Sequence, residues 1–436
     1  MTTTQFTLNQ GQKDAADDLY RWLMKPDEKH IILSGPGGVG KSYLISYLID
    51  ELIPRYHKMC DLVNIPPVYT QVNLTAMSNK AVEVLSESTG MPCSTAHSFL
   101  GLIVVNDYST GATKIKKGKK WQIHSNSIII IDEYSMEDYR FFQFLNESTL
   151  NCKIIHVGDH CQLAAVGDNI PYVSQQNIPR IDLTEQMRNK GQPALQSLCL
   201  HLRNQVETMQ FSPIDLVPGV VDLLSGEDFQ KEIESNFLDP EIQNKYRILA
   251  YSNGRVNTYN SFIRDLRQQP RLPVKGEYLI CNSAFMPNNV KGFATEEEVH
   301  ITDISSQVEV LNLPDGGCLE VVYGTLDGQF VTRTNVPIPV DRSHYEALVK
   351  HYKRSKDWTT YFKLKDEIPD LRPRDANTIH KSQGSSYDTV YVDLDDLSTC
   401  RNPATAARLL YVAASRARNR VVFYGNLPKQ LGGLNV

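Results

Sequence analysis

The chain has 436 residues, of which 41% are hydrophobic, and a formal net charge of −5. This length predicts roughly three domains with ordinary cores, and the charge excludes a globally basic protein, so a nucleic-acid site must be a local groove. The eight cysteines are scattered without disulfide or zinc spacing, which favours a reduced cytoplasmic protein. A polar N-terminus and the lack of a membrane-length apolar run predict neither a signal peptide nor a membrane span.

Gln12 precedes the first predicted helix. A glutamine amide can pair with both a donor and an acceptor on adenine. A helix-capping or solvent-facing glutamine explains the position equally well, and both interpretations stay open.

The segment that organises the chain runs from residue 35 to residue 42 and reads Gly-Pro-Gly-Gly-Val-Gly-Lys-Ser. It follows a buried-strand run, His30–Leu33, and precedes an apolar helical run, which is the context of a phosphate loop. Lys41 is expected to reach the β- and γ-phosphates, and Ser42 to hold Mg²⁺. We therefore predict a nucleoside triphosphate site made of Gly35, Pro36, Gly37, Gly38, Val39, Gly40, Lys41 and Ser42.

Two later turns carry small polar side chains where a predicted strand meets a helix. Hydroxyl and amide groups in such turns can contact phosphates. Helix capping is about as good an explanation for each residue taken singly. The candidates are Ser78, Asn79, Thr95, His97 and Ser98.

Residues 101–126 differ from their surroundings. Strand-like runs at 103–105 and 121–123 flank a turn, and five lysines lie between them, at 114, 116, 117, 119 and 120. This predicts a hairpin arm with a basic tip. Because Tyr108 and Trp121 lie beside the lysines, nucleic-acid contact and a merely solvated arm are equally good interpretations.

A buried strand at 127–131 ends in Asp132 and Glu133, which suits magnesium binding and proton acceptance from water. The next strand ends near Gln162, which could sense the γ-phosphate. Arg188, after a further strand, could contact the γ-phosphate or form a surface ion pair. A metal pair of His160 and Cys161 is not expected, because further ligands are missing.

A second α/β unit opens at 246–253, where Tyr251 could stack on a base or lie in the core. Alternating short strands from 268 to 339 predict a small β-barrel insertion, and the α/β pattern returns at 377–386. The acidic group at 393, 395 and 396 is expected in a solvated loop. On the last helix, Arg416 and Arg418 are candidate arginine fingers.

Together these motifs resemble the superfamily 1 helicases of the RecD/Dda branch, and size and order are most similar to phage-encoded members. Gln12 matches the Q motif, and Arg188 falls on the arginine after motif III. Met77 to Asn79 departs from the pattern of motif Ia. The remaining matches are residues 35–42 to motif I, 74–81 to Ia, 95–98 to the next DNA motif, 131–136 to II, 158–163 to III, 377–386 to V and 411–418 to VI.

The resemblance implies an α/β fold with two RecA-like parallel-sheet lobes, 1–185 and 186–267 with 372–436. It also implies an SH3-like accessory insertion at 268–371 and a strand-separating pin at 101–126. The implied catalytic residues are Lys41, Glu133, Gln162, Arg188 and Arg416, with Gln12, Tyr251, Gly384 and Arg416 at the nucleotide and Ser42 and Asp132 at Mg²⁺. The implied DNA contacts are Ser78, Asn79, Thr95, His97, Ser98, Tyr108, Trp121, Thr378, His380 and Lys381.

The implied activity is ATP-driven movement, 5′ to 3′, on single-stranded DNA with duplex separation at a fork. A translocase that remodels protein–DNA complexes is an alternative, as are a small-molecule kinase and a nucleotide switch. A kinase needs no second lobe with a finger, and a switch needs neither Glu133 nor Arg416. The working unit is expected to be a monomer without a membrane partner, and a single-stranded-DNA-binding protein is a candidate partner.

Overall fold

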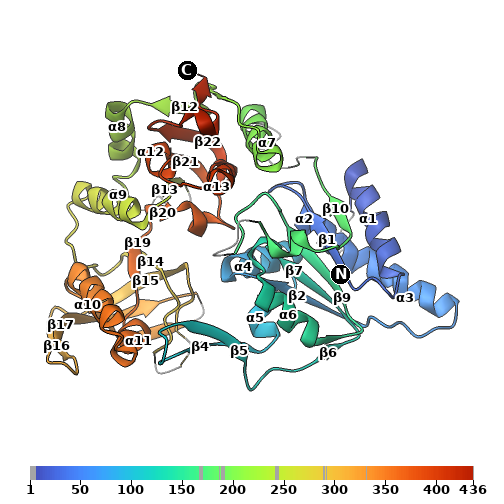
Figure 1. The fold of residues 1–436 in the computed structure, drawn as a ribbon, viewed down its shortest axis with the longest axis horizontal. Helices are drawn as coiled ribbons and strands as arrows, with labels where there is room; N and C mark the ends of the chain where they lie inside the picture. Colours follow the sequence, from blue (N-terminus) through green and yellow to red (C-terminus); the bar gives the residue numbers. More distant parts are fainter. Residues whose placement is uncertain are drawn as a thin grey trace. The chain divides into compact units, whose positions relative to one another are not determined.

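The computed structural model describes residues 6–165, 170–185, 187, 192–240, 245–287, 290, 292–329 and 331–435. These residues form an α/β fold that divides into two compact units (Figure 1). Unit 1 comprises residues 1–103, 117–225 and 382–436, and unit 2 comprises residues 104–116 and 226–381. Within the described part of the chain, no helix has the length and apolar character needed to cross a membrane.

Unit 1 contains a parallel sheet with the strand order β10-β1-β9-β7-β2-β3. Its central strand β7 (Ser127–Asp132) carries four consecutive isoleucines that are at most 1% exposed. Such two-sided burial is typical of a parallel strand covered on both faces. The other strands are β1 (His30–Ser34), β2 (Gln71–Ala76), β3 (Cys93–Thr95), β9 (Lys153–Gly158) and β10 (Arg180–Asp182).

The helices of the N-terminal part of unit 1 pack an apolar face against the sheet. Leu19 of α1 and Leu44 of α2, for example, lie in the main core cluster. These helices are α1 (Gln10–Leu23), α2 (Lys41–Tyr47), the π-helical turn Leu48–Leu52, α3 (Ile53–Leu62), α4 (Asn79–Thr89), α5 (Ala96–Phe99) and α6 (Tyr139–Glu147). Short elements complete this part: β6 (His124–Ser125), β8 (Thr149–Leu150) and the 3₁₀ turns Tyr134–Met136 and Tyr172–Gln175.

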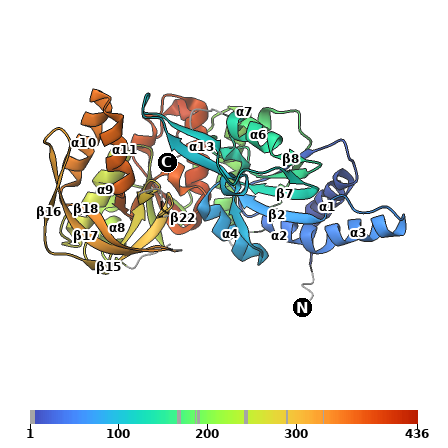
Figure 2. The same cartoon turned by 90° about the horizontal axis from the view of Figure 1, so that it is seen from below.

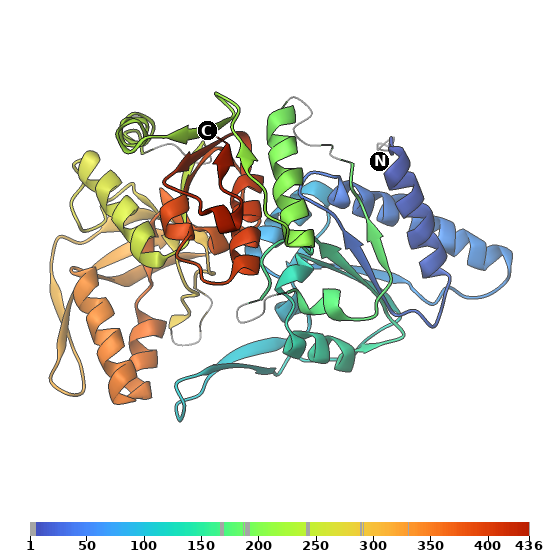
Figure 3. The same cartoon turned by 45° about the horizontal axis from the view of Figure 1, so that its top comes forward.

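The rest of unit 1 is a second parallel arrangement, in which β22 pairs with both β12 and β21. Helix α7 (Pro193–Thr208) packs beside α13 (Pro403–Ser415), as the green and red helices in Figure 3 show. The strands and smaller elements are β11 (Ile214–Asp215), β12 (Val221–Leu224), β21 (Tyr387–Asp393), α12 (Leu394–Leu397), β22 (Ala417–Tyr424), the 3₁₀ turn Lys429–Leu431 and β23 (Leu434–Asn435).

The acidic group at 393–396 does not lie in a solvated loop, so that prediction was wrong for Asp393. Its side chain is buried and accepts a hydrogen bond from the backbone N–H of Asp396, which caps α12. A short carboxylate is a favoured N-cap, because it satisfies a helix N–H that has no partner within the helix.

Unit 2 contains an antiparallel half-barrel sheet with the order β16-β17-β15-β14-β19, and β18 pairs with β17. This sheet confirms the predicted β insertion, whereas its SH3-like character stays a prediction. The strands are β14 (Tyr278–Cys281), β15 (Glu297–Ile304), β16 (Glu309–Asn312), β17 (Cys318–Asp327), β18 (Thr332–Pro339) and β19 (Leu371–Pro373). Three elements precede this sheet in the chain: α8 (Gly226–Asn236), β13 (Tyr246–Ala250) and α9 (Asn253–Leu266). Two elements follow it, β20 (Ala376–Thr378), which pairs with β13 in parallel, and the 3₁₀ turn Ile379–Ser382.

Two helices, α10 (Arg342–Ser355) and α11 (Trp358–Glu367), lie side by side next to the half-barrel (Figure 2). Tyr345 and Tyr352 of α10 and Leu364 of α11 share a buried cluster with β17. The opposite face of α10 is solvent-exposed and includes Lys350. The helix pair therefore extends the accessory unit without a core of its own.

Strands β4 (Leu102–Asn106) and β5 (Thr113–Lys117) form the predicted hairpin. Its tip is Asp107–Ala112, and the lysines lie on β5 and beyond, so the prediction of a basic tip was wrong. Residues 121–123 form no strand, although their alternation predicted one. Lys117 instead stacks on the Trp121 ring, 4.0 Å from its centroid, which ties the aromatic to the base of the hairpin.

Candidate nucleotide and DNA sites

The loop between β1 and α2 has the backbone geometry of a phosphate loop. Gly38 and Gly40 have φ angles of 87° and 84°, in the left-handed region where a side chain would be strained. A Cβ atom at Gly40 would collide with the Gln12 amide, and one at Gly35 with the Leu183 carbonyl. Glycine is therefore required at these positions by backbone conformation and by close packing.

Lys41 starts α2, and its ammonium group is folded back onto the loop. Its Nζ donates to the carbonyl oxygens of Gly35 at 2.8 Å and Pro36 at 3.0 Å. Burial lowers the Lys41 pKa, while the negative charges of Asp159 and Asp132 act in the opposite direction. The ammonium is thus held by weak neutral acceptors, from which a phosphate could take it over.

Two adjacent carboxyl groups follow β7 at the carboxyl edge of the sheet. Burial, then the charge of Glu133, raises the pKa of Asp132 to about 7. Glu133 has a left-handed backbone, with φ at 59°, and burial raises its pKa against the charge of Arg416. Its Oε2 atom is buried and has no hydrogen-bond partner within the described residues. The site therefore has an unused buried acceptor, as a base awaiting a water molecule requires.

The oxygen donors at this position suit Mg²⁺, because it prefers carboxylate and hydroxyl ligands and keeps several waters. Ser42 and Asp132 would hold it. A separate group, Asp159, His160 and Cys161, brings its ligand atoms within 4.8 Å of one another among the described residues. The Arg203 guanidinium lies 2.5 Å from Asp159 there and supplies the positive charge, so a metal is not needed.

Arg416 follows α13 and is buried. Its guanidinium donates to the carbonyl oxygens of Val412 and Ser385, at 3.2 and 3.3 Å, and to the Ser415 hydroxyl. Its charge lowers the pKa of Glu133, so the two groups lie within electrostatic reach. The candidate finger and the candidate base thus belong to one site within unit 1.

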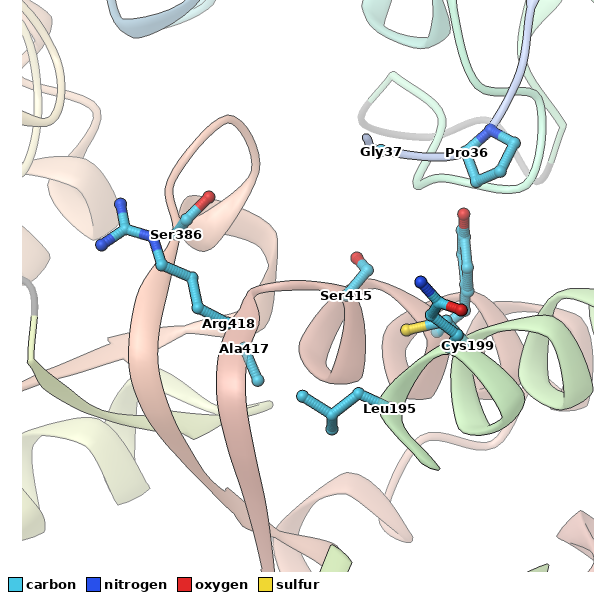
Figure 4. A pocket seen from close by; sticks show the side chains of 10 residues that line it. Pro36, Gly37, Leu195, Cys199, Ser386, Ser415, Ala417 and Arg418 are labelled. Carbon is cyan, nitrogen blue, oxygen red and sulfur yellow. The ribbon is translucent and has the colours of Figure 1, made fainter. Parts of the chain in front are cut away.

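A pocket of unit 1 joins the phosphate loop to the end of α13 (Figure 4). Pro36 and Gly37 lie on one side of it, and Ser415, Ala417 and Arg418 on the other. The remaining lining residues are Leu195, Gln196, Cys199, Ser386 and Tyr411. The pocket therefore connects the two motifs that the sequence analysis assigned to the nucleotide.

Two further predicted nucleotide residues, Gln162 and Gly384, lie in the described part of the chain. Gln162 is buried and accepts a long hydrogen bond, 3.4 Å, from Gln383. Gly384 has a φ angle of 77°, so it forms a tight turn that glycine favours. Arg188 lies outside the described residues, and its contact with the γ-phosphate stays a prediction.

Gln12 forms a capping box with Asn9. The Asn9 side chain accepts from the Gln12 backbone N–H at 2.7 Å, and the Gln12 Oε1 accepts from the Asn9 N–H at 3.2 Å. Its Nε2 donates to the Val39 carbonyl of the phosphate loop at 3.2 Å. The amide is thus committed to capping, and an adenine contact, which stays a prediction, would have to replace these bonds.

Apart from Trp121, the predicted DNA residues of unit 1 lie at the start of α4 or at the start of α5 and within it. The hydroxyl oxygens of Ser78 and Thr95 each accept from a backbone N–H three residues on and so cap α4 and α5. Asn79 opens α4, and Ser98 lies within α5. The His97 ring packs on Phe141, 5.0 Å between centroids, and burial lowers its pKa.

The predicted DNA residues of unit 2 in motif V differ in accessibility: Thr378 is buried, Lys381 is half-buried and His380 is exposed. The His380 ring lies 6.2 Å from that of Tyr251. Lys381 forms an ion pair with Glu296 at 2.7 Å and also donates to Asn282 of the half-barrel. Lys381 therefore ties motif V to the β insertion, and its DNA contact stays a prediction.

The chain matches two protein families at the positions of these motifs. Residues 7–214 match the AAA domain family, and residues 375–424 match the UvrD-like helicase C-terminal domain. The ATP-dependent DNA helicase Dda of Enterobacteria phage T4 is 23% identical over 95% of this chain and 99% of its own length. These matches support a superfamily 1 helicase, which is an ATP-hydrolysing enzyme.

A further relative and a solved structure also match nearly the whole length of the chain. An uncharacterized protein of Acanthamoeba polyphaga mimivirus is 25% identical over 95% of this chain and 99% of its own. Pif1 helicase from Bacteroides, solved with ADP–AlF3 and single-stranded DNA, has a TM-score of 0.50 and 16% identity over 98% of this chain and 94% of that one. At this identity the structural likeness supports the RecA-like fold alone.

The hairpin of this helicase is packed at its tip against α11 within unit 2. The Tyr108 ring meets Phe362 edge to face, 5.2 Å between centroids, and Asn106 donates to Asp366 at 3.0 Å. A Cβ atom at Gly111 would collide with the Trp358 ring. Tyr108 nevertheless remains 57% exposed, so it can both hold the tip in place and contact a ligand.

Arg203, Arg408 and Tyr411 contact motif III, and the sequence analysis did not find them. Arg408 donates to the carbonyl oxygens of His160 and Gln162, and Tyr411 donates to Asp159. Tyr411 falls within motif VI, but a tyrosine on an apolar helix gives no sign of its partner. Arg203 lies on α7 outside all motifs, and only its i,i+4 spacing to Glu207 was visible.

Proposed function

We propose that this helicase moves 5′ to 3′ along single-stranded DNA and separates duplex DNA at a fork, driven by ATP hydrolysis. The observation that carries the proposal is the two-sided pocket of unit 1, lined by Pro36 and Gly37 of the phosphate loop and by Ser415 and Arg418 of motif VI. A site made of distant sequence segments favours turnover coupled to movement over a static nucleotide switch. The 5′ to 3′ direction rests on the resemblance to the RecD/Dda branch.

Each residue of the nucleotide site has a role that follows from its surroundings. Lys41 would exchange its two carbonyl acceptors for the β- and γ-phosphates, whose charge it balances. Glu133 would accept a proton from the attacking water, because its Oε2 has no other partner within the described residues. Arg416 would stabilise the charge that develops on the transferring phosphoryl group. Bound Mg²⁺, held by Ser42 and Asp132, would neutralise phosphate charge.

Single-stranded DNA is the proposed ligand of the turns around α4 and α5 and of motif V. Small hydroxyl and imidazole groups at such turns suit phosphate contacts that carry no sequence information. The candidate contacts are Ser78, Asn79, Thr95, His97, Ser98, Thr378, His380 and Lys381. The Bacteroides Pif1 structure contains single-stranded DNA, which supports this choice of ligand.

The hairpin is the proposed pin that blocks one strand at the fork. A freely solvated hairpin could yield to a duplex, but this tip is anchored on α11 by Tyr108, Asn106 and Gly111. The exposed part of the Tyr108 ring could stack on the last base pair, and stacking is worth about 1–3 kcal/mol per base. That is comparable to opening one base-pair step, about 1.4 kcal/mol on average.

The test is to measure ATP hydrolysis and strand separation on the same DNA substrates. The proposal predicts that single-stranded DNA raises phosphate release and that a fork with a 5′ tail is unwound faster than one with a 3′ tail. A translocase that only remodels protein–DNA complexes would displace a bound protein without unwinding. A kinase would transfer the phosphate to a small acceptor and ignore DNA.

A further inference from the structure

The buried carboxylate of Asp159 is a junction between three elements of unit 1. Its Oδ1 accepts from Arg203 of α7 at 2.5 Å and from the Cys161 N–H at 3.0 Å. Its Oδ2 accepts from the Tyr411 hydroxyl of α13 at 2.6 Å. Burial alone would raise the Asp159 pKa, but the charges of Arg203 and Lys41 hold it below its usual value.

Helix α7 also holds the neighbouring histidine. The Arg203 Nε lies 3.2 Å from Glu207, one turn later, and Glu207 accepts from the His160 Nε2 at 3.1 Å. The His160 Nδ1 lies 3.0 Å from the Ser34 hydroxyl of β1 and 3.4 Å from the Arg203 Nη2. These partners place the proton on Nε2, since Nδ1 must accept from the guanidinium. Arg203 and Glu207 thus clamp motif III to one face of α7.

The loop that carries Asp159 also contacts the start of the phosphate loop. The Gly35 N–H donates to the carbonyl oxygen of Gly158, the residue before Asp159, at 3.0 Å. The Ser34 hydroxyl, at the end of β1, lies 3.0 Å from the Nδ1 of His160, the residue after Asp159. Motif III is therefore held by the phosphate loop on one element and by Arg203 on another.

The same loop reaches motif V and the helix that leads to the finger. Gln162 of motif III and Gln383 of motif V form a hydrogen bond of 3.4 Å. Arg408 and Tyr411, three residues apart on α13, both bond to motif III, and Arg416 follows that helix. A shift in the balance of charge at Asp159 can thus reach α7, α13 and motif V through direct contacts.

We propose that Arg203 is a positioning residue of the ATPase cycle: by holding Asp159, it links the state of the phosphate loop to α7 and makes ATP turnover responsive to DNA. A shift of the phosphate loop on phosphate binding would act on Asp159 through Gly158, and Arg203 would pass it on to α7. This inference rests on the proposed function and assigns a role that lies outside the helicase motifs of this chain.

The experiment compares the ratio of DNA-stimulated to DNA-free ATP hydrolysis in the wild type and four variants. Arg203→Met removes the guanidinium but leaves a buried, unpaired carboxylate, which is destabilising. The double variant Arg203→Met with Asp159→Asn removes that charge as well, while the asparagine oxygen can still accept from Tyr411. Arg203→Lys restores the charge, and Arg21→Met, at a side chain that is 71% exposed, is the matched control.

We expect the folded double variant to lose at least about tenfold in the stimulation ratio, with KM for ATP changed by less than threefold. Arg203→Lys should keep part of the wild-type stimulation ratio, and the control Arg21→Met should keep the whole of it. A double variant that melts like the wild type and keeps the wild-type ratio would overturn the proposal, because the ion pair would then be purely structural. A raised KM with an intact ratio would also overturn it. A wild-type enzyme that ignores DNA would instead refute the proposed function itself.

Discussion

The phosphate loop of unit 1 and the hairpin tip of unit 2 are assembled from the sequence in opposite ways. Lys41 bonds to carbonyl oxygens only five and six residues away, and Asp132 and Glu133 are neighbours. At the hairpin tip, Asn106 bonds to Asp366, 260 positions later. The phosphate loop depends on the local conformation of the backbone, whereas the hairpin tip depends on packing between segments that are distant in the sequence.

Because of this difference, we expect ATP hydrolysis and strand separation to depend on different regions of the molecule. The nucleotide site can be complete without the hairpin, since the phosphate loop, Asp132, Glu133 and Arg416 belong to unit 1. The hairpin tip contacts only unit 2 residues among those named above and carries no catalytic group. We therefore expect variants of the first region to abolish every activity and variants of the second to spare hydrolysis.

The largest effect is expected for Glu133→Gln, which keeps the shape of the side chain and removes the proton acceptor. ATP hydrolysis should fall by about 10²–10⁴-fold, the usual contribution of a general base, while ATP and DNA binding persist. Phosphate release and equilibrium binding of a fluorescent ATP analogue check the two parts separately. Normal hydrolysis would show that another group accepts the proton.

Lys41→Ala should reduce ATP turnover by about a hundredfold or more, because one charge contact to the phosphates is worth roughly 3 kcal/mol. Turnover is measured at saturating ATP and DNA. Lys58→Ala, at an exposed lysine of α3, is the control and should turn over ATP normally. Near-normal turnover of the Lys41 variant would contradict the assignment of residues 35–42 as the phosphate loop.

The hairpin tip is tested by the double variant Tyr108→Ala with Trp358→Ala. Unwinding should fall by about tenfold, in line with the loss of roughly 1–3 kcal/mol of ring contacts, while DNA-stimulated hydrolysis stays within twofold. Trp358→Phe keeps a ring under Gly111 and should preserve most unwinding. If unwinding and hydrolysis fall together, the two regions are not separable.

The sequence predicted the parts of the fold whose signal is local. The four isoleucines of β7 predicted a buried parallel strand, and the glycines at 35–40 predicted the phosphate loop. Where one residue type serves two purposes, the sequence could not decide. Gln12, Ser78 and Thr95 cap helices in the structure, although the same amide and hydroxyl groups also suit ligand contacts.

Contacts across long stretches of chain were beyond prediction. The lysines of the arm predicted a basic tip, but the turn forms at Asp107–Ala112, where Asp107 accepts from Ser109. Asp107 also pairs with Lys114 at 2.6 Å, so one of those lysines stabilises the hairpin itself. The sequence around Arg203 showed only an i,i+4 spacing to Glu207 and not its role, because that role depends on a carboxylate 44 positions earlier.

The smallest predicted effect concerns stability in acid. Burial, then the charge of His156, lowers the His30 pKa to about 3, so folded His30 stays neutral while unfolded His30 takes up a proton below its ordinary pKa of 6.5. The stability contribution is thus full above pH 6.5 and is lost as the pH falls toward 3. His30→Gln should flatten the slope of unfolding free energy between pH 6 and 5 by up to about 1.4 kcal/mol per pH unit.

Urea unfolding at several pH values measures this slope. His344→Gln, at an exposed histidine of α10, is the matched control and should leave the slope unchanged. An unchanged slope in the His30 variant would mean that the buried pair of His30 and His156, 3.0 Å apart, is already protonated or opens before unfolding.

The central claim is that this helicase couples ATP hydrolysis to DNA, and the most direct test is phosphate release with and without single-stranded DNA. We predict a rise of at least about tenfold on addition of saturating DNA, which Lys41→Ala abolishes. The rise should shrink with added salt, because phosphate contacts release counterions from the DNA backbone. An equal rate with and without DNA, in a protein that hydrolyses ATP, would contradict the account.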